Sequence, residues 1–488
     1  MATASDHNGR HSLDVLVVGA GISGLCAAYD ILKERKDSRV VVLEAKDRIG
    51  GRLDSTQLKT ANGVDTWDVG GQWVGLEQKD IMCLLEELGV ETYEQWYVGD
   101  KIIQLGDGAL KKYSGGYPSV SYLSLLDIYL LNNKIDKLCS MVPLDDPSKC
   151  LHADEWDGMT VESWIKQHAW TTGTTVIEMI EIAVGCIFGV TTAQMSLLFF
   201  LHYVKSCSGW KFLVESGVKD GAQQFKIKGT AHNMTKILAE RIGWNKIRLG
   251  QPVISVRQNV DNVVVQTHSG QTYVAKYVIL AIPPHLTGKI DFLPRLPYNK
   301  QRIMQNMIPS HLTKFIVTYP TAFWRTKGLS GEIAHATGKH HCESDPIALT
   351  LDGTTSNGSP AMLGFIASYA AAKWSDKSEE EKKDAVIKSL SRYLGPDTEQ
   401  PLDCAIKEWS QEEWNGGCPV DVMVPGAITN YGDCLSEPFK RLVTAINYTL
   451  LHWAGTETSN VHRGYISGGV YSAHRAAKEV MERLQANE

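Results

Sequence analysis

The pattern of apolar positions near the N-terminus predicts a βαβ unit. Leu13 to Val18 and Val40 to Leu43 are short apolar runs of the length expected for buried strands. Between them, Leu25 to Arg35 carries apolar residues at helical spacing, and a glycine-rich turn precedes this helix. The order of strand, turn, helix and strand indicates an α/β fold.

A second β-rich region lies in the middle of the chain. Val253 to Val256, Val263 to Thr267 and Tyr273 to Ala281 are predicted strands that form a meander feeding a buried strand. Helical patterns with a few strands separate the two β-rich regions and recur after the second, which predicts a lobe inserted twice. We therefore predict one domain built from residues 1–82, 210–288 and 396–488, and a second built from residues 83–209 and 289–395.

The longest uncharged stretch, Ile182 to Val204, approaches the length of a membrane span. Gly185, Gly189 and Gln194 interrupt it, so a buried pair of helices is the better interpretation. The last residues, Ala473 to Glu488, predict a charged amphipathic helix and not an anchor. We expect no membrane span in this chain.

Composition places the chain among ordinary folded proteins. It has 488 residues, 43% hydrophobic and 21% charged, and this length predicts more than one hydrophobic core. The net charge of −6 supplies none of the positive surface that nucleic acid requires, so we expect a small-molecule partner. The segment Met1 to Ser12 has no signal-peptide pattern, and the charge run Ser378 to Asp384 predicts a solvated helix start.

Two groups of residues could suggest metal or redox chemistry. None of the ten cysteines forms a C-x-x-C pair. His335, His340, His341 and Cys342 lie close in sequence, but their spacing matches no common zinc pattern. A surface loop is the better interpretation of this group, and we predict no metal site.

The turn after the first strand has the glycine pattern of a dinucleotide-binding site. In Gly19-Ala20-Gly21-Ile22-Ser23-Gly24 the first glycine makes the turn, the second admits a pyrophosphate, and the third packs helix on strand. The helix N-terminus offers N–H groups and a positive dipole end to the phosphates. Glu44 lies 20 residues after Gly24, where an acidic side chain accepts hydrogen bonds from ribose hydroxyls.

Two further glycine pairs extend this contact. Glu44 and Ala45 lead into Arg48-Ile49-Gly50-Gly51-Arg52, and Asp68-Val69-Gly70-Gly71-Gln72-Trp73 follows. Paired glycines let the backbone run close against a long cofactor, and Arg52 can neutralise a phosphate. An extended contact of this kind favours FAD over NAD.

A third glycine-rich region lies near the C-terminus. Trp453-Ala454-Gly455-Thr456-Glu457-Thr458 leads to Gly464-Tyr465-Ile466-Ser467-Gly468-Gly469, which offers a second helix N-terminus to a flavin. Together these motifs resemble the flavin-containing amine oxidase family, and most specifically the monoamine oxidases, from about Leu13 to Val480. The resemblance implies an α/β fold with a discontinuous, Rossmann-like FAD-binding domain and a mixed α+β substrate domain, so the first predicted domain is assigned to FAD.

The resemblance also implies which residues contact FAD. They come from the glycine motifs, the middle β-rich region and the C-terminal quarter: Gly19, Gly21, Ile22, Ser23, Gly24, Glu44, Ala45, Arg48, Gly50, Gly51, Arg52, Gly70, Gly71, Gln72, Trp73, Val253, Trp409, Cys418, Gly455, Thr456, Glu457, Tyr465 and Ile466.

One segment implies a covalent cofactor. Trp409-Ser410-Gln411-Glu412-Glu413-Trp414-Asn415-Gly416-Gly417-Cys418 is similar to the segment where monoamine oxidases bond the flavin 8α carbon to a cysteine. A cysteine after two glycines has room to approach a planar ring, and a thiolate is the nucleophile that this bond requires. We expect 8α-S-cysteinyl FAD at Cys418; a free buried thiol is the alternative.

Three residues are expected at the reacting end of the flavin. Lys314, in an apolar strand-like run, matches the lysine that holds a water near flavin N5 in the family and assists reoxidation by oxygen; a solvent-facing lysine is the alternative. Tyr465 matches one of the two aromatic residues that, in the family, guide the amine toward the flavin face. The second aromatic residue should be a tyrosine directly after the cysteine, but Pro419 follows Cys418 here. Trp409 or another nearby aromatic residue is a candidate to replace it.

Two further positions depart from the family pattern. Ser206 stands where a substrate-contacting glutamine is expected, and Leu329 stands where the pocket often has an aromatic or branched gate. These departures, with Pro419, leave the identity of the amine open.

The implied reaction is the FAD-dependent oxidative deamination of amines, with O2 as the acceptor and H2O2 as a product. We expect a monoamine substrate. Alternatives are a polyamine or L-amino-acid oxidase, a dehydrogenase with a protein or quinone acceptor, and a flavin-binding protein without turnover. A homodimer and a cytoplasmic location are further expectations; a C-terminal tail removed from this chain would instead indicate the mitochondrial outer membrane.

Overall fold

The N-terminal βαβ unit lies inside a large mixed sheet. The computed structural model describes residues 12–106, 108–116, 118–170, 174–214, 221–336, 344–432, 434–443 and 446–486. Strand β1 (Leu13–Val18) pairs in parallel with β2 (Val40–Leu43) on one side and with β13 (Thr272–Leu280) on the other. Strand β2 and the C-terminal end of β13, Tyr277–Leu280, are apolar and mostly buried, and the predicted α/β unit is confirmed.

The middle β-rich region completes this sheet. Its order is β10-β2-β1-β13-β12-β11-β14, and β23 and β22 continue from β13. The predicted meander is confirmed, because β11, β12 and β13 pair as antiparallel neighbours. The bounds of the added strands are β10 Ile247–Arg248, β11 Val253–Gln258, β12 Val263–Thr267, β14 Asp291–Leu293, β22 Phe439–Val443 and β23 Ile446–Trp453.

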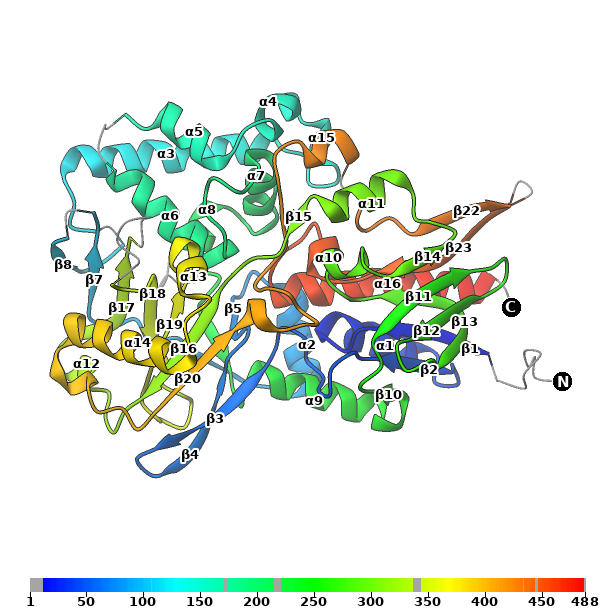
Figure 1. The fold of residues 1–488 in the computed structure, drawn as a ribbon, viewed down its shortest axis with the longest axis horizontal. Helices are drawn as coiled ribbons and strands as arrows, with labels where there is room; N and C mark the ends of the chain where they lie inside the picture. Colours follow the sequence, from blue (N-terminus) through cyan, green and yellow to red (C-terminus); the bar gives the residue numbers. More distant parts are fainter. Residues whose placement is uncertain are drawn as a thin grey trace.

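Helices from opposite ends of the chain pack together beside the first sheet. In Figure 1 the blue α1 (Ile22–Glu34) lies alongside the red α16 (Ile466–Ala486), and α9 (Ala231–Ile242) also packs on α1. A Cβ on Gly469 would lie 3.0 Å from the side chains of both Ile22 and Ser23, so glycine permits this approach. Helices α1 and α16 therefore begin close to each other.

A second sheet forms the other lobe. Its order is β20-β16-β19-β18-β17-β7-β8, with antiparallel pairing on both sides of β16. The bounds are β7 Asp100–Gln104, β8 Leu110–Tyr113, β16 Thr313–Thr318, β17 Leu329–His335, β18 Leu349–Asp352, β19 Ala361–Ile366 and β20 Asp403–Glu408.

Alternation along β16 separates the two faces of this sheet. Phe315 and Val317 pack in one apolar cluster with Leu390 of α14 (Glu379–Leu394). Ile316 packs instead with Trp67 of β4 (Gly63–Asp68), which belongs to the N-terminal part of the chain. Since side chains alternate along a strand, Lys314 shares the face of Ile316, toward the first lobe.

The remaining elements cap the lobes and connect them. In Figure 1, α3 and α5 to α8 lie over the second sheet on the side away from α14. Their bounds and those of the short strands and helices are α2 Lys79–Leu88, α3 Tyr122–Met141, α4 Ala153–Asp157, α5 Val161–His168, α6 Thr175–Phe188, α7 Leu197–Ser206, α8 Trp210–Val214, α10 Pro284–Thr287, α11 Tyr298–Gln305, α12 Phe323–Thr326, α13 Ser368–Trp374, α15 Ala427–Tyr431, β3 Ser55–Thr60, β5 Trp73–Val74, β6 Thr92–Glu94, β9 Phe225–Ile227, β15 Met307–Ile308 and β21 Val422–Met423.

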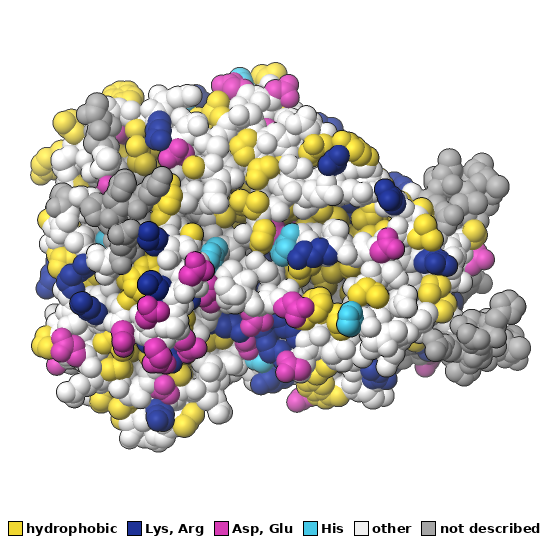
Figure 2. All heavy atoms as spheres, viewed as in Figure 1, with side chains coloured by type: hydrophobic (Ala, Val, Ile, Leu, Met, Phe, Trp, Pro, Cys, Tyr) yellow, Lys and Arg dark blue, Asp and Glu magenta, His cyan; other side chains and the backbone are white. Residues whose placement is uncertain are grey.

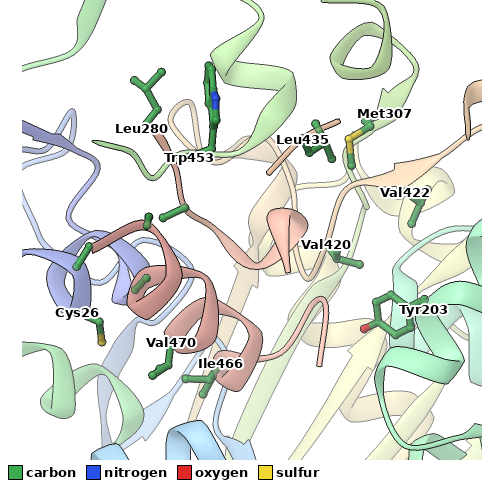
Figure 3. Packing of buried hydrophobic residues seen from close by; sticks show 14 of the residues in the cluster. Cys26, Tyr203, Leu280, Met307, Val420, Val422, Leu435, Trp453, Ile466 and Val470 are labelled. Atoms are coloured by element: carbon green, nitrogen blue, oxygen red, sulfur yellow. The ribbon is translucent and has the colours of Figure 1, made fainter. Parts of the chain in front are cut away.

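The apolar core is continuous across segments that are distant in sequence. Figure 3 shows Leu280 of β13, Trp453 of β23, Ile466 of α16 and Tyr203 of α7 in one packed region with Val420. On the surface, Figure 2 shows Lys and Arg side chains interspersed with Asp and Glu. The segment that carries Cys418 therefore runs through the core, close to the start of α16.

Two predictions about helices are tested directly. The stretch 182–204 forms parts of the buried helices α6 and α7, as expected, and no helix among the described residues is long and apolar enough to cross a membrane. The charged run at Ser378 does start α14, with a capping box to Glu381. Within it, however, Lys382 is buried and pairs with Glu408, so the run is only partly solvated.

The assignment of His335 to a surface loop is wrong. This residue ends β17, is buried, and lies 3.1 Å from the Ile347 carbonyl through Nδ1. The strand pairing carries it into the sheet interior. His340, His341 and Cys342 lie outside the described residues, and no cluster of metal-ligating side chains occurs within the described ranges.

The division into two domains stays a prediction, and two strands bear on its boundaries. Strand β14, at Asp291–Leu293, pairs in the first sheet although it follows residue 288. Strand β20, at Asp403–Glu408, pairs with β16 in the second sheet although it follows residue 396. Sheet membership thus changes after Leu293 and after Glu408, and not at residues 288 and 396.

Candidate functional site

Two cavities meet where the lobes join. The first, of about 310 Å³, runs from the glycine turn of β1 and α1 toward the start of α16. The second, of about 790 Å³, lies between the second sheet and the helices that cover it. Both are lined by Gly71, Cys418, Pro419, Gly464, Tyr465 and Ile466. A long ligand in the first cavity would therefore reach the second at Cys418 and Tyr465.

The glycine turn has the local geometry that a dinucleotide requires. Gly19 has φ +102°, and a Cβ there would lie 2.6 Å from the Ala281 carbonyl oxygen. A Cβ on Gly24 would lie 1.9 Å from the Gly19 oxygen, so the helix can pack only without one. Gly21 is different, because its Cβ would meet nothing closer than 3.9 Å. Its backbone is open to the cavity, which suits the approach of a pyrophosphate.

Glu44 lines the first cavity at the end of β2. Its Oε2 accepts a hydrogen bond from the Ala20 N–H at 2.7 Å, and its Oε1 accepts one from the Lys46 N–H at 3.0 Å. Burial raises the pKa of the Glu44 carboxyl, and these two backbone donors oppose that rise. A carboxylate keeps further acceptor sites for ribose hydroxyls, so Glu44 fits its predicted place.

The second glycine pair is held by Arg48. Its guanidinium donates to the carbonyls of Ile49, Gly51 and Leu53 at 3.2 to 3.3 Å. Arg48 lines neither cavity. Its contribution to the cofactor site is therefore the shape of this turn.

Arg52 is paired with a carboxylate inside the protein. Its guanidinium donates to both carboxylate oxygens of Glu457, at 2.5 and 2.9 Å, and to the Pro419 carbonyl at 2.7 Å. Glu457 is buried and lies behind the cavity wall. Arg52 also lines the first cavity, so its predicted contact with FAD stays a prediction, and the same side chain holds the turn after Cys418.

Cys418 lies on a backbone turn fixed by Ser310. The Cys418 N–H donates to the Ser310 carbonyl at 3.1 Å, and the Val420 N–H donates to the Ser310 hydroxyl at 3.2 Å. A Cβ on Gly417 would lie 2.3 Å from the Ser310 oxygen. Burial raises the pKa of the Cys418 thiol to about 11, opposed by the positive charges of Arg52 and Lys314.

The segment before Cys418 is anchored by charges that sequence reasoning missed. Lys46, which lines the first cavity, bonds to Glu412 and to the side-chain oxygen of Asn415. Lys407 bonds to the other oxygen of Glu412 and pairs with Asp54 at 3.3 Å. Glu412 and Asn415 were visible in the sequence, but their shared partner Lys46 lies 366 and 369 residues away.

Lys314 is buried and faces the second cavity, so the solvent-facing alternative is wrong. Its ammonium donates to the Gly70 carbonyl at 3.0 Å and to the Gln72 side-chain oxygen at 2.7 Å. Burial lowers the pKa of Lys314, and the carboxylate of Asp68 opposes that shift. The amide nitrogen of Gln72 has no hydrogen-bond partner within the described residues, as expected beside a polar ligand.

Aromatic residues surround the junction of the cavities. Tyr465 lines both cavities, and Trp409 lines the second, with its Nε1 donating to the Val69 carbonyl at 3.0 Å. Tyr203 of α7 also lines the second cavity, and a Cβ on Gly464 would lie 2.4 Å from its hydroxyl. Tyr203 is thus a further aromatic neighbour of Tyr465, which the sequence did not indicate because it lies on a distant helix.

Ser206 and Leu329, the two positions that depart from the family's pocket pattern, do not line the second cavity. Ser206 lies on the C-terminal turn of α7, where its hydroxyl donates to the Tyr203 carbonyl at 2.8 Å. Leu329 packs in the apolar cluster beneath the sheet with Trp324 and Phe315. Both are corrections: helix and strand orientation turn these side chains away from the cavity.

The other predicted FAD contacts mostly gather as expected. The first cavity is lined by Gly19, Gly21, Ile22, Ser23, Ala45, Gly50, Gly51, Val253, Gly455, Thr456 and Ile466, and the second by Gly70, Gly71, Gln72 and Trp73. Gly24 and Glu457 line neither cavity: Gly24 lets the helix pack on the Gly19 turn, and Glu457 binds Arg52. The residues present fit FAD, since the first cavity offers a phosphate turn, a ribose acceptor and an open path to Cys418.

Comparison with known proteins decides the family. The chain matches the flavin containing amine oxidoreductase family over residues 22–481. The chain belongs to this family. It is 35% identical to amine oxidase [flavin-containing] A of Canis lupus familiaris, over 97% of this chain and 86% of that protein. It is also 32% identical to a probable flavin-containing monoamine oxidase A of Dictyostelium discoideum, over 96% of this chain and 98% of that protein.

Solved structures agree with the amine oxidase fold. Cyclohexylamine oxidase from Brevibacterium oxydans is 27% identical, with a TM-score of 0.87 over 97% of this chain and 100% of that one. A putrescine oxidase bound to putrescine is 25% identical, with a TM-score of 0.85 over 96% and 99% of the two chains. Membership of the flavin-containing amine oxidoreductases makes FAD the cofactor and amine oxidation the reaction.

The Arg52–Glu457 pair provides a stability test. Glu457→Gln should lower the free energy of unfolding by about 3 kcal/mol, because it leaves the partly buried Arg52 guanidinium without its buried counter-charge. Urea unfolding measures this, and replacing both partners in Arg52→Met/Glu457→Leu should recover most of the loss. Glu87→Gln, which breaks an exposed pair with Lys33, is the matched control and should cost less than about 1 kcal/mol. Equal costs for the two single changes would contradict this account of the buried pair.

Proposed function

We propose that this protein is a monoamine oxidase that carries its FAD covalently on Cys418. The observation that supports this best is the convergence of Cys418, Tyr465 and Lys314 around the point where the two cavities meet. A flavin attached at Cys418 would present its ring to the second cavity, with Lys314 and the Tyr465 ring beside it. When bound, FAD accepts a hydride equivalent from the α carbon of the amine and passes two electrons to O2.

The chain's own residues have distinct parts in this proposal. Tyr465, with Trp409 or Tyr203, supplies aromatic surface that orients a neutral amine without proton transfer. Lys314 and Gln72 supply the polar groups at the ring, where Lys314 holds a water and assists the reaction of O2. The glycine turn and Glu44 hold the nucleotide end.

The charges of the second cavity favour a monoamine over a diamine or an amino acid. Two acids line it within the described residues, Asp136 and Glu332, against Lys101, Lys211 and Lys314. Glu332 pairs with Lys101 at 3.0 Å. A second ammonium would therefore meet lysines as well as carboxylates. An amino-acid carboxylate would lack the bidentate guanidinium that suits it, since the described lining contains no arginine.

Peroxide formation tests this function. With purified holoenzyme, benzylamine should give amine-dependent H2O2, with kcat/KM at least about tenfold above that for putrescine or L-phenylalanine. For benzylamine, kcat/KM should rise with pH until the amine is neutral, because the α C–H can be transferred only from the unprotonated amine. Oxygen-electrode and peroxidase-coupled assays measure both.

Each other outcome identifies a different alternative. A preference for putrescine or phenylalanine would replace the monoamine proposal by a polyamine or amino-acid oxidase. Flavin reduction by benzylamine without reaction with O2 would indicate a dehydrogenase. Neither reduction nor peroxide with any amine would leave a flavin-binding protein without turnover.

The covalent bond is tested by acid precipitation. Yellow colour should stay with the wild-type pellet and wash out of Cys418→Ala, measured by absorbance. Bond formation removes the Sγ hydrogen of Cys418 and one hydrogen of the 8α carbon; the two electrons stay on the flavin until O2 accepts them and forms H2O2. Cys26→Ala, another buried thiol, is the control and should keep the colour. Complete release of flavin from the wild type would overturn the assignment of Cys418.

The role of Lys314 is tested by separating the two half-reactions. Lys314→Met should slow reoxidation of the reduced enzyme by O2 about 100-fold, since a preorganised donor is lost, and should leave reduction by benzylamine nearly unchanged. Stopped-flow absorbance measures both rates. Lys226→Met is the matched control, because Lys226 is also a buried lysine with a lowered pKa but lines neither cavity. Equal effects of the two variants on reoxidation would contradict the proposal.

A further inference from the structure

We propose that His285 is a positioning residue for covalent flavin attachment, acting through Asp421 on the segment that carries Cys418. This inference rests on the proposed bond at Cys418 and names residues outside the motifs that indicated it. His285 lies on the short helix α10, directly after Pro283 and Pro284, and Pro283 and Leu286 line the first cavity.

One imidazole contacts both ends of the Cys418 segment. On the Nδ1 side, His285 lies 2.6 Å from Asp421 Oδ2. On the Nε2 side, it lies against Gly416, where a Cβ would be only 2.6 Å from Nε2. Residues 416 to 421 therefore run from one side of the ring to the other, with Cys418 between the two contacts.

The pair is buried, so it constrains the segment strongly. The side chains of His285 and Asp421 are 11% and 5% exposed. Within the described part of the chain, the Asp421 carboxylate has two hydrogen bonds. Both involve His285, one through its ring Nδ1 and one through its backbone N–H. Moving Asp421 away would leave a buried carboxylate without a donor, which is costly.

The other contacts of the segment do not replace this pair. Ser310 fixes the backbone at Cys418 and Val420, and Arg52 binds the Pro419 carbonyl. At the ends, Lys46 binds Asn415 beside Gly416, and the Asp421 N–H donates to Glu457 Oε1 at 3.4 Å. Each of these contacts fixes one position, whereas the single ring of His285 touches both Gly416 and Asp421. Since formation of a carbon–sulfur bond requires a well-oriented nucleophile, a small displacement of Sγ slows the bond much more than it weakens FAD binding.

The experiment measures the rate of covalent incorporation. Apoprotein from a riboflavin-starved host is mixed with FAD, and acid-stable flavin is followed with time. We expect His285→Ala and Asp421→Ala to slow incorporation about tenfold or more, with the affinity for non-covalent FAD, measured in the Cys418→Ala background, changed less than about twofold. His285→Asn keeps a donor toward Asp421 but does not reach Gly416, so its rate should be intermediate.

A matched control variant separates an effect on the position of Cys418 from an effect on the stability of the fold. His452 is also a buried histidine that contacts a carboxylate through Nδ1, lying 2.7 Å from Glu479, with no partner for Nε2 in the described part of the chain. It lines neither cavity. His452→Ala should lower the melting temperature as His285→Ala does, but should leave the incorporation rate within about twofold of wild type.

The outcomes distinguish this inference from the proposed function. Wild-type protein without acid-stable flavin would refute the bond at Cys418 itself. Acid-stable flavin that forms at the wild-type rate in His285→Ala would refute only the role of His285. Equal slowing by His285→Ala and His452→Ala at equal loss of stability would refute positioning in favour of a general effect on folding.

Discussion

The ion pair between Arg52 and Glu457 is the constraint on which the site depends. It joins residues 405 positions apart, and the same guanidinium binds the carbonyl of Pro419, next to Cys418. Three segments distant in sequence thus meet at one guanidinium: the second glycine turn, the cysteine turn and the short turn Thr456–Thr458 that follows β23. Because breaking a buried pair leaves an uncompensated charge, these segments cannot separate cheaply.

Around this pair, the two lobes contribute different chemistry. The first lobe supplies glycine turns, helix N-termini and the Glu44 carboxylate, together with Lys46, Arg52 and Lys289, which suit a long, anionic cofactor. The second lobe supplies side chains, with Lys314 and aromatic rings facing the cavity from the sheet and its covering helices. Lys314 connects the two, since its partners Gly70 and Gln72 belong to the N-terminal part of the chain.

Much of the fold and of the cofactor site was predictable because the signals are local. The glycines at 19, 21 and 24 and the acid at 44 have fixed spacing within one βαβ unit; Gly19, Gly21 and Glu44 line one cavity, and Gly24 packs the helix behind it. The predictions for Ser206 and Leu329 were wrong for a common reason. Whether a side chain faces a cavity depends on how its helix or strand packs against distant segments, and those segments are not encoded near it in sequence.

The sequence by itself determined the βαβ unit, the meander, the dinucleotide turn and the family, because each depends on residue type at short, regular spacing. Only the tertiary structure decided that Arg52 faces Glu457, that Lys314 is buried beside Gln72, and that His285 reaches Asp421. Those contacts join residues between 136 and 405 positions apart. They form when the two sheets and their helices pack, so no local pattern can specify them.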